Sequence, residues 1–136
     1  MPFEPVLYAS RSQRLLGQLL DGLVGASPLI LAAILSSFND SIGSTGAMLG
    51  IAWMIFYYFL SDGLPDGQSL AKRWLGMRVV SARTGAPCGF GQSILRNLLL
   101  AILGPLDWIF IFGDQHQRLG DMAAGTIVVS VPRSLR

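Results

Sequence analysis

The sequence predicts an all-α membrane protein with two transmembrane helices, a broken or re-entrant third hydrophobic segment and a short cytoplasmic two-stranded β-ribbon. First, the 136 residues are 51% hydrophobic and 13% charged, whereas a soluble domain usually carries about 25% charged residues. Second, three apolar runs approach the ~20 residues that a helix needs to cross a bilayer. Third, the basic residues flank these runs, which is typical of membrane topology rather than of nucleic-acid binding.

The first apolar run, residues 14–36, predicts an amphipathic membrane helix. At about 100° per residue its polar and small residues share one face. They are Arg14, Gln18, Asp21, Gly25, Pro28, Ala32 and Ser36. An intramembrane carboxylate is tolerated only where it faces protein or water and has a partner, so this helix is expected to pack against other segments. The run is longer than the 7–15 residues typical of a signal peptide, so we expect it to be retained.

The second apolar run, residues 47–60, predicts a second span if it begins near Ile42. Residues 37–46 are polar and small and predict a turn-rich connector. Trp53, Tyr57 and Tyr58 are expected near the headgroup layer, where aromatic rings concentrate. Residues 61–67 are dense in Gly, Pro and Asp and predict a break.

A basic loop follows the second run. Its cations include Lys72, Arg73 and Arg78. Residues 69–76 predict a short helix with its cations reaching toward water. Residues 77–81 predict a strand.

The third apolar run, residues 94–112, contains Arg96 near its start and Gly104, Pro105 and Asp107 in its middle. It is either one interrupted crossing or two half-helices that form a re-entrant hairpin, which other helices must cover. Beyond it, residues 118–124 predict a helical turn and residues 126–131 a strand that can pair with residues 77–81.

The distribution of basic residues predicts the orientation. Arg11 and Arg14 precede the first run, and none lies between the first two runs. Four follow the second run: Lys72, Arg73, Arg78 and Arg83. By the positive-inside rule the N-terminus and the central loop are expected in the cytoplasm. Arg118, Arg133 and Arg136 in the tail favour the re-entrant hairpin, because a full third crossing would place them outside.

Three separated motifs carry a family resemblance. They are Arg14 with Asp21, GQSLAKRWLGMRVV over residues 67–80, and RLGDMAAGTIVV over residues 118–129. In this order they resemble the RDD family of small bacterial membrane proteins, over about residues 8–131. The resemblance implies one RDD-like membrane domain, residues 1–136, in the bacterial inner membrane, and suggests transport. It assigns Arg14 as the family's arginine, Asp21 as its first aspartate and Asp121 as the acid of the tail motif. Ala71 departs from the pattern, which has Gly before the Lys.

The polar residues at membrane depth are the candidate site. They are Arg14, Gln18, Asp21, Arg96, Asp107, Arg118 and Asp121. Asp21 is expected to pair with Arg96, Arg78 or Arg118, either in a network that locks helices together or as a proton or cation site with Asp107. Asp121 is expected to cap a helix or to fasten the tail to the basic loop.

The sequence contains no recognised enzyme motif, and the single Cys88 excludes an internal disulfide and a Cys-based metal site. A non-enzymatic protein without metal or cofactor is therefore expected. Two functions are compatible with this pattern. One is ion-coupled or small-solute transport, with Asp21 as the intramembrane site and a homo-oligomer enclosing the path. The other is a membrane accessory or scaffold protein that binds a partner membrane protein.

Overall fold

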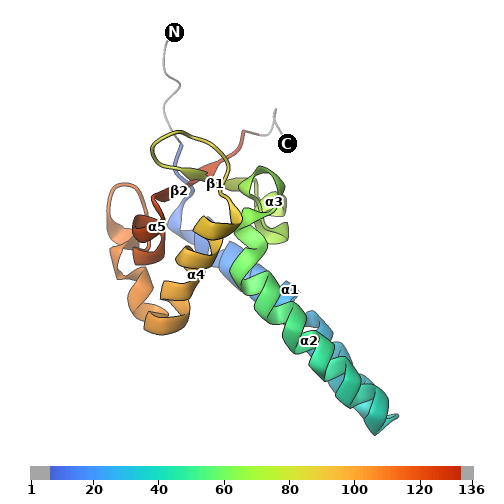
Figure 1. The fold of residues 1–136 in the computed structure, drawn as a ribbon. Coiled ribbons are helices and arrows are strands. Elements are labelled where there is room, and N and C mark those ends of the chain that lie inside the picture. The colour runs from blue at the N-terminus through green and yellow to red at the C-terminus, as the bar shows by residue number, and fades with distance from the viewer. Residues whose placement is uncertain (1–6, 133–136) are drawn as a thin grey trace.

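A computed structural model describes residues 7–132 of the chain. The fold is mostly helical with one small sheet (Figure 1). The elements are α1 (Arg11–Ser36), α2 (Asp40–Leu60), η1 (Ser61–Gly63), η2 (Pro65–Gly67), α3 (Leu70–Leu75), β1 (Met77–Ser81), α4 (Phe90–Leu103), η3 (Gly104–Phe112), α5 (Leu119–Ala124) and β2 (Thr126–Ser130). Three helical segments are long and apolar enough to cross a membrane: Arg11–Ser36, Asp40–Gly63 and Phe90–Phe112.

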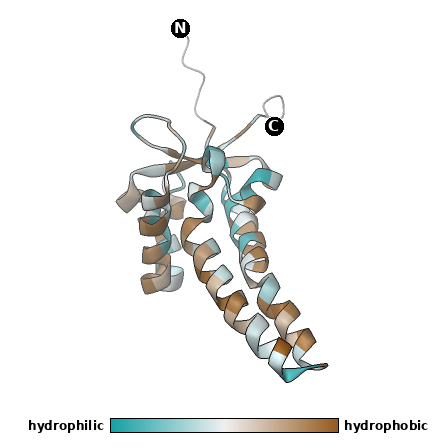
Figure 2. Cartoon of the chain, turned by 45° about the vertical axis from the view of Figure 1, so that its right-hand side comes forward, coloured by the Kyte–Doolittle hydropathy of each residue, from teal (hydrophilic) through white to brown (hydrophobic). Residues whose placement is uncertain are grey.

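Helices α1 and α2 form a long antiparallel hairpin that projects from the rest of the chain (Figure 1). Asn39 caps α2 by accepting a hydrogen bond from the Ile42 amide, so the helix begins at Asp40. The predicted connector over residues 37–46 is therefore wrong beyond residue 39. The hairpin is apolar along most of its length (Figure 2), and large apolar side chains such as Leu23, Ile30 and Leu49 are exposed.

The polar and small face predicted for α1 is the face that packs against protein. Arg14, Asp21, Gly25 and Ala32 are all buried. Close approach of α2 depends on its glycines, since a Cβ on Gly43 would lie 2.4 Å from Ser36 Cβ and 2.6 Å from Ser36 Cα. Leucines on the opposite side of α1 remain exposed, which is the arrangement expected of a lipid-facing surface.

The third apolar segment is broken, as predicted. Helix α4 ends at Leu103, because the φ of 57° and ψ of −132° of Gly104 leave the helical region, and the 3-10 helix η3 follows. Phe90 at the start of α4 lies against Gly63, and the Phe112 carbonyl at the end of η3 accepts a hydrogen bond from Arg11 Nη2 at 3.2 Å. Because α1 begins where α2 ends, both ends of this segment lie at the same end of the molecule (Figure 1).

The sheet closes that end of the molecule. Strands β1 and β2 pair antiparallel with Val79 opposite Val128, which confirms the predicted pairing. Tyr8 adds an isolated bridge to Val129. The apolar core beneath consists of Ala9, Met77, Val79, Cys88 and Val128. Arg133 and Arg136, used above to predict the orientation, lie outside the described residues.

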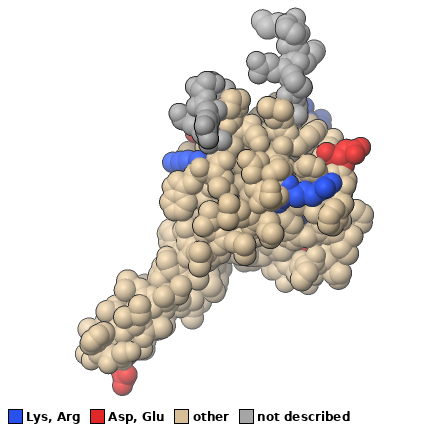
Figure 3. All heavy atoms as spheres, turned by 180° about the vertical axis from the view of Figure 1, so that it is seen from behind, with Lys and Arg blue, Asp and Glu red and all other residues tan. Residues whose placement is uncertain are grey.

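On the face shown in Figure 3, exposed charged side chains lie only at the two ends of the described part of the molecule, the hairpin tip and the sheet. One acidic side chain lies at the tip of the hairpin, and several charged side chains lie around the sheet end (Figure 3). The long surface between them is uncharged, which suits contact with hydrocarbon.

Candidate ionic network and cavity

Four basic and four acidic side chains form one buried network at the sheet end of α1 and α2. The bases are Arg14, Lys72, Arg96 and Arg118, and the acids are Asp21, Asp62, Asp107 and Asp121. All eight are at most 9% exposed. The numbers of positive and negative charges are equal, so the cost of burying them is offset by mutual pairing.

Asp21 is held by donors from α2 and from α3 with its N-cap residue. Its Oδ1 accepts a hydrogen bond from Tyr57 Oη at 2.6 Å. Its Oδ2 accepts from Ser69 Oγ at 2.6 Å and lies 3.2 Å from Lys72 Nζ. The predicted partners Arg96, Arg78 and Arg118 are therefore wrong, because α3 places its own lysine against α1. Tyr57 is 3% exposed, so its ring packs against protein.

Lys72 joins two carboxylates. Its Nζ lies 2.7 Å from Asp62 Oδ1 as well as 3.2 Å from Asp21 Oδ2. Ser69 caps α3 by accepting a hydrogen bond from the Lys72 amide, and Gly76 ends the helix in the left-handed region at φ 69°. Within this six-residue helix the Lys72 side chain is buried. The prediction that the cations of this helix reach toward water is wrong for Lys72, whereas Arg73 is exposed.

Arg96 connects the α2 end to the tail. Its Nη1 lies 2.5 Å from Asp62 Oδ2, and its Nη2 lies 2.6 Å from Asp121 Oδ1. Helix α5 approaches α4 closely here, since a Cβ on Gly120 would lie 2.2 Å from the Arg96 carbonyl oxygen. Gly120 therefore permits Asp121 to reach Arg96.

Asp121 receives the largest number of cations in the network. Arg14 Nη2 donates to its Oδ2, and the Arg118 amide donates to the same oxygen at 3.1 Å in a helix-capping arrangement. The predicted capping role is thus present, but the cations that fasten the tail are Arg14 and Arg96 rather than those of the basic loop. Burial alone raises the pKa of Asp121, but the Arg96, Arg14 and Arg118 guanidiniums outweigh it and hold the pKa below its ordinary value.

Asp107 lies in a different part of the network from Asp21. One of its oxygens accepts from the Gly120 amide at 2.8 Å, and the other lies 3.5 Å from Arg118 Nη1. Two guanidiniums lie near the indole ring of Trp108, with Arg14 Cζ at 5.8 Å and Arg118 Cζ at 5.6 Å from the ring centre. A joint cation site of Asp21 with Asp107 finds no support in these contacts.

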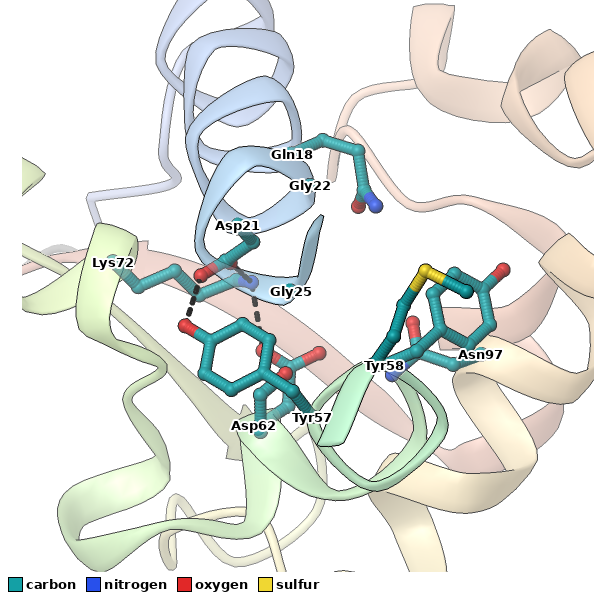
Figure 4. A pocket seen from close by; sticks show the side chains of 11 residues that line it. Gln18, Asp21, Gly22, Gly25, Tyr57, Tyr58, Asp62, Lys72 and Asn97 are labelled. Atoms are coloured by element: carbon teal, nitrogen blue, oxygen red, sulfur yellow. Dashed lines mark hydrogen bonds and ion pairs between the residues drawn. The ribbon is translucent and has the colours of Figure 1, made fainter. Parts of the chain in front are cut away.

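A cavity of about 160 Å³ opens beside Asp21. Asp21, Tyr57, Lys72 and Asp62 point toward one another at its wall, with Gln18 and Asn97 nearby (Figure 4). Its volume exceeds that of a single water molecule several times over. In residues 7–132 no group of three or more His, Cys, Asp or Glu side chains could hold a metal ion.

The structure brings six residues of the predicted polar set into the network. They are Arg14, Asp21, Arg96, Asp107, Arg118 and Asp121. Gln18 lines the cavity instead. Lys72 of the predicted basic loop joins the network, whereas Arg73 and Arg78 do not form its ion pairs. Sequence reasoning missed Asp62, which stands in a Gly- and Pro-rich break and resembles an ordinary turn residue.

The fold and the buried ionic network define a membrane-type helical protein. The RDD family profile matches residues 8–125. The chain therefore belongs to the RDD family, and the family resemblance is confirmed.

The names of two similar proteins describe no activity. The chain is 31% identical over 128 residues to an uncharacterized protein of Haemophilus influenzae, covering 89% of this chain and 77% of that protein. It is 34% identical over 86 residues to a "proline-rich antigen homolog" of Mycobacterium tuberculosis, covering 60% of this chain and 35% of that protein. No solved structure matches.

Proposed function

We propose that this RDD protein exchanges a small cation at the cavity beside Asp21, as part of ion-coupled or small-solute transport. The observation that carries the proposal is the position of Lys72 Nζ, within 3.2 Å of Asp21 and 2.7 Å of Asp62, at the wall of a cavity large enough for a hydrated ion. The chain is proposed to be non-enzymatic.

The chemistry is a competition between the lysine and a free cation. Protonated Lys72 neutralises part of the charge of two carboxylates. If Lys72 passes its proton to a water molecule in the cavity, those carboxylates present an anionic site with the Tyr57 hydroxyl beside it. Binding one monovalent cation as one proton leaves conserves the charge of the site, so the site does not have to bury uncompensated charge.

The proposed topology follows the positive-inside rule. The N-terminus, the sheet and the basic loop are placed in the cytoplasm, α1 and α2 cross the inner membrane, and Phe90–Phe112 enters and returns as a re-entrant hairpin. The return of Phe112 to Arg11 supports this arrangement. Because so few helices hardly enclose a path, a homo-oligomer in the lipid bilayer is proposed, and no nucleic-acid partner is expected.

Flux measurements in vesicles test the proposal. Purified protein is reconstituted with a pH-sensitive dye inside the vesicles, and gradients of sodium, potassium or lithium are applied in turn. Cation-driven proton flux is expected from the native chain and is expected to be lost in Asp21→Asn. Asp40→Asn, at the exposed start of α2, is the matched control and should retain the flux. Native flux equal to that of empty vesicles would remove the proposal.

A second candidate function is a membrane scaffold that binds a partner membrane protein. The observation that favours it is that the network holds equal numbers of acidic and basic side chains, so every acid already has a cation. Under this alternative, Asp21→Asn lowers the level of the protein in the membrane or its co-purification with a partner, and the native chain carries no flux.

A further inference from the structure

A second cavity shares Lys72 with the first and is lined by different charges. Its volume is about 10 Å³, close to the lower limit of about 10–15 Å³ for holding one water molecule. Lys72 and Gln18 line both cavities. The remaining wall comes from α1, α4, η3, the tail and the sheet, so the cavity lies at the centre of the ionic network.

Cations surround this second cavity. Arg14, Lys72, Arg96 and Arg118 all line it, and none of the described residues that line it is acidic. The four carboxylates of the network offset these cations in total charge. At the cavity itself the cations are the nearer charges, and a Coulomb energy falls with distance. The local field therefore favours a negative charge.

The second observation is that three buried guanidinium nitrogens on residues lining this cavity make no hydrogen bond within the described part of the chain. Arg14 is 6% exposed and Arg118 is 2% exposed. Among residues 7–132, Arg14 Nη1 finds no hydrogen-bond acceptor, and neither do Nε and Nη1 of Arg118. The nearest carboxylate oxygens to the two Arg118 atoms are 3.8 Å and 3.5 Å away, too far for a hydrogen bond. The acceptor that faces Arg118 Nη1, Asp107 Oδ2, also makes no hydrogen bond to the described residues. A buried charged donor without an acceptor is costly, and an acceptor in the cavity would remove that cost for Arg14 Nη1 and Arg118 Nε.

We propose that the second cavity is a binding site for one small monovalent anion of the halide class. The guanidiniums of Arg14 and Arg118 would donate to it, and Lys72 would connect it to the cation cavity. Met77 also lines the cavity, and its unbranched side chain can adjust to the radius of the ion. The proposal concerns binding and stands independently of cation flux.

Chloride titration of the purified protein in detergent tests the site. Trp53→Phe and Trp74→Phe leave Trp108, which lines the cavity, as the one tryptophan of the three in the sequence. Chloride replaces gluconate at constant ionic strength. A saturable change in Trp108 emission and a saturable rise in the thermal midpoint are expected, because a ligand that binds the folded state stabilises it. No dependence on chloride would overturn the proposal and leave water as the occupant.

A cavity-filling variant distinguishes chloride binding in the cavity from chloride binding at the protein surface. Val128 lines the cavity, so Val128→Ile adds a methyl group there without changing charge. It is expected to weaken the apparent chloride affinity by about tenfold or more. Val79→Ile is the matched control, because Val79 is the opposite residue on β1 and is not among the residues lining the cavity. An equal chloride response in Val128→Ile would overturn the proposal.

Ion size gives a test that needs no change to the cavity. Fluoride and chloride are expected to act at lower concentrations than iodide, because the cavity is small. The opposite order, with iodide strongest, would show adsorption of weakly hydrated ions at the protein surface and would contradict the site.

Discussion

Lys72 is the cation that two carboxylates of the network share. Asp21 comes from α1 and Asp62 from the turn after α2, and the single ammonium group lies within ion-pair distance of both. The sequence predicted Asp21 as a buried acid because it interrupts an apolar run. It could not predict Asp62, because an acid beside Gly and Pro is typical of a solvent-exposed turn.

Lys72→Met is expected to destabilise the protein strongly. It leaves two buried carboxylates without their shared cation, and breaking a buried pair in this way costs about 3–5 kcal/mol. Arg73→Met is the matched control, since the neighbouring side chain is exposed and surface changes usually stay within about 0.5 kcal/mol. Thermal unfolding in detergent measures both. Equal midpoints for the two variants would contradict the role given to Lys72.

Asp121 predicts a pH dependence of stability. Its pKa is lower in the folded chain than in the unfolded chain. The unfolded state therefore binds more protons as the pH falls through the ordinary aspartate pKa of about 3.9. The stabilisation from Asp121 is complete above that value and is lost progressively below it. Asp121→Asn should lower the midpoint at neutral pH and flatten its fall between about pH 5 and pH 3. A slope identical to the native slope would show that other acids carry the effect.

At the scale of elements, the polar stripe of α1 and the paired strands followed from periodicity. The break at Gly104 followed from Gly and Pro within an apolar run. The start of α2 could not be predicted in this way, because Asn39 caps the helix within a stretch whose small polar residues suggested a connector. The partner of Asp21 was also missed, because the position of α3 against α1 depends on tertiary packing that no local pattern encodes.

Close contact in the α1–α2 hairpin is expected to depend on Gly43. Gly43→Ala places a methyl group against the backbone of Ser36, and overpacking of this kind costs about 1–3 kcal/mol. Gly22→Ala is the matched control, because nothing lies within 4 Å of its Cβ position and Ala is the better helix former by up to about 1 kcal/mol. Thermal midpoints in detergent should fall for the first variant and hold or rise for the second. A fall of equal size in both would contradict the packing argument.

At the scale of the whole molecule, charge is concentrated at one end of a long apolar body. The hairpin tip and the sheet lie at opposite ends of the described part of the molecule (Figure 1). Composition predicted this division, because charged residues avoid the three apolar runs except at the positions that form the network. The side of the membrane on which the sheet lies rests on the positive-inside rule.

Labelling of single cysteines tests that orientation. In a Cys88→Ala background, Ser41→Cys at the tip is expected to react with an impermeant maleimide in intact cells. Thr84→Cys, in the exposed loop after β1, should react only after the cells are permeabilised. Reaction of both cysteines in intact cells would contradict a hairpin that crosses the membrane. Reaction of the Thr84→Cys variant alone in intact cells would show the opposite orientation.

The pairing of Arg14 with Asp121 spans 107 residues of sequence. During synthesis the first helix therefore reaches the membrane long before the ribosome makes the aspartate that neutralises its arginine. Until then Arg14 must be accommodated by water, lipid phosphate or the insertion machinery. A chain that stops after residue 114 would keep this temporary state permanently. Such a chain is expected to be degraded faster than the full-length protein, and pulse-chase labelling of the two would reveal the difference in lifetime.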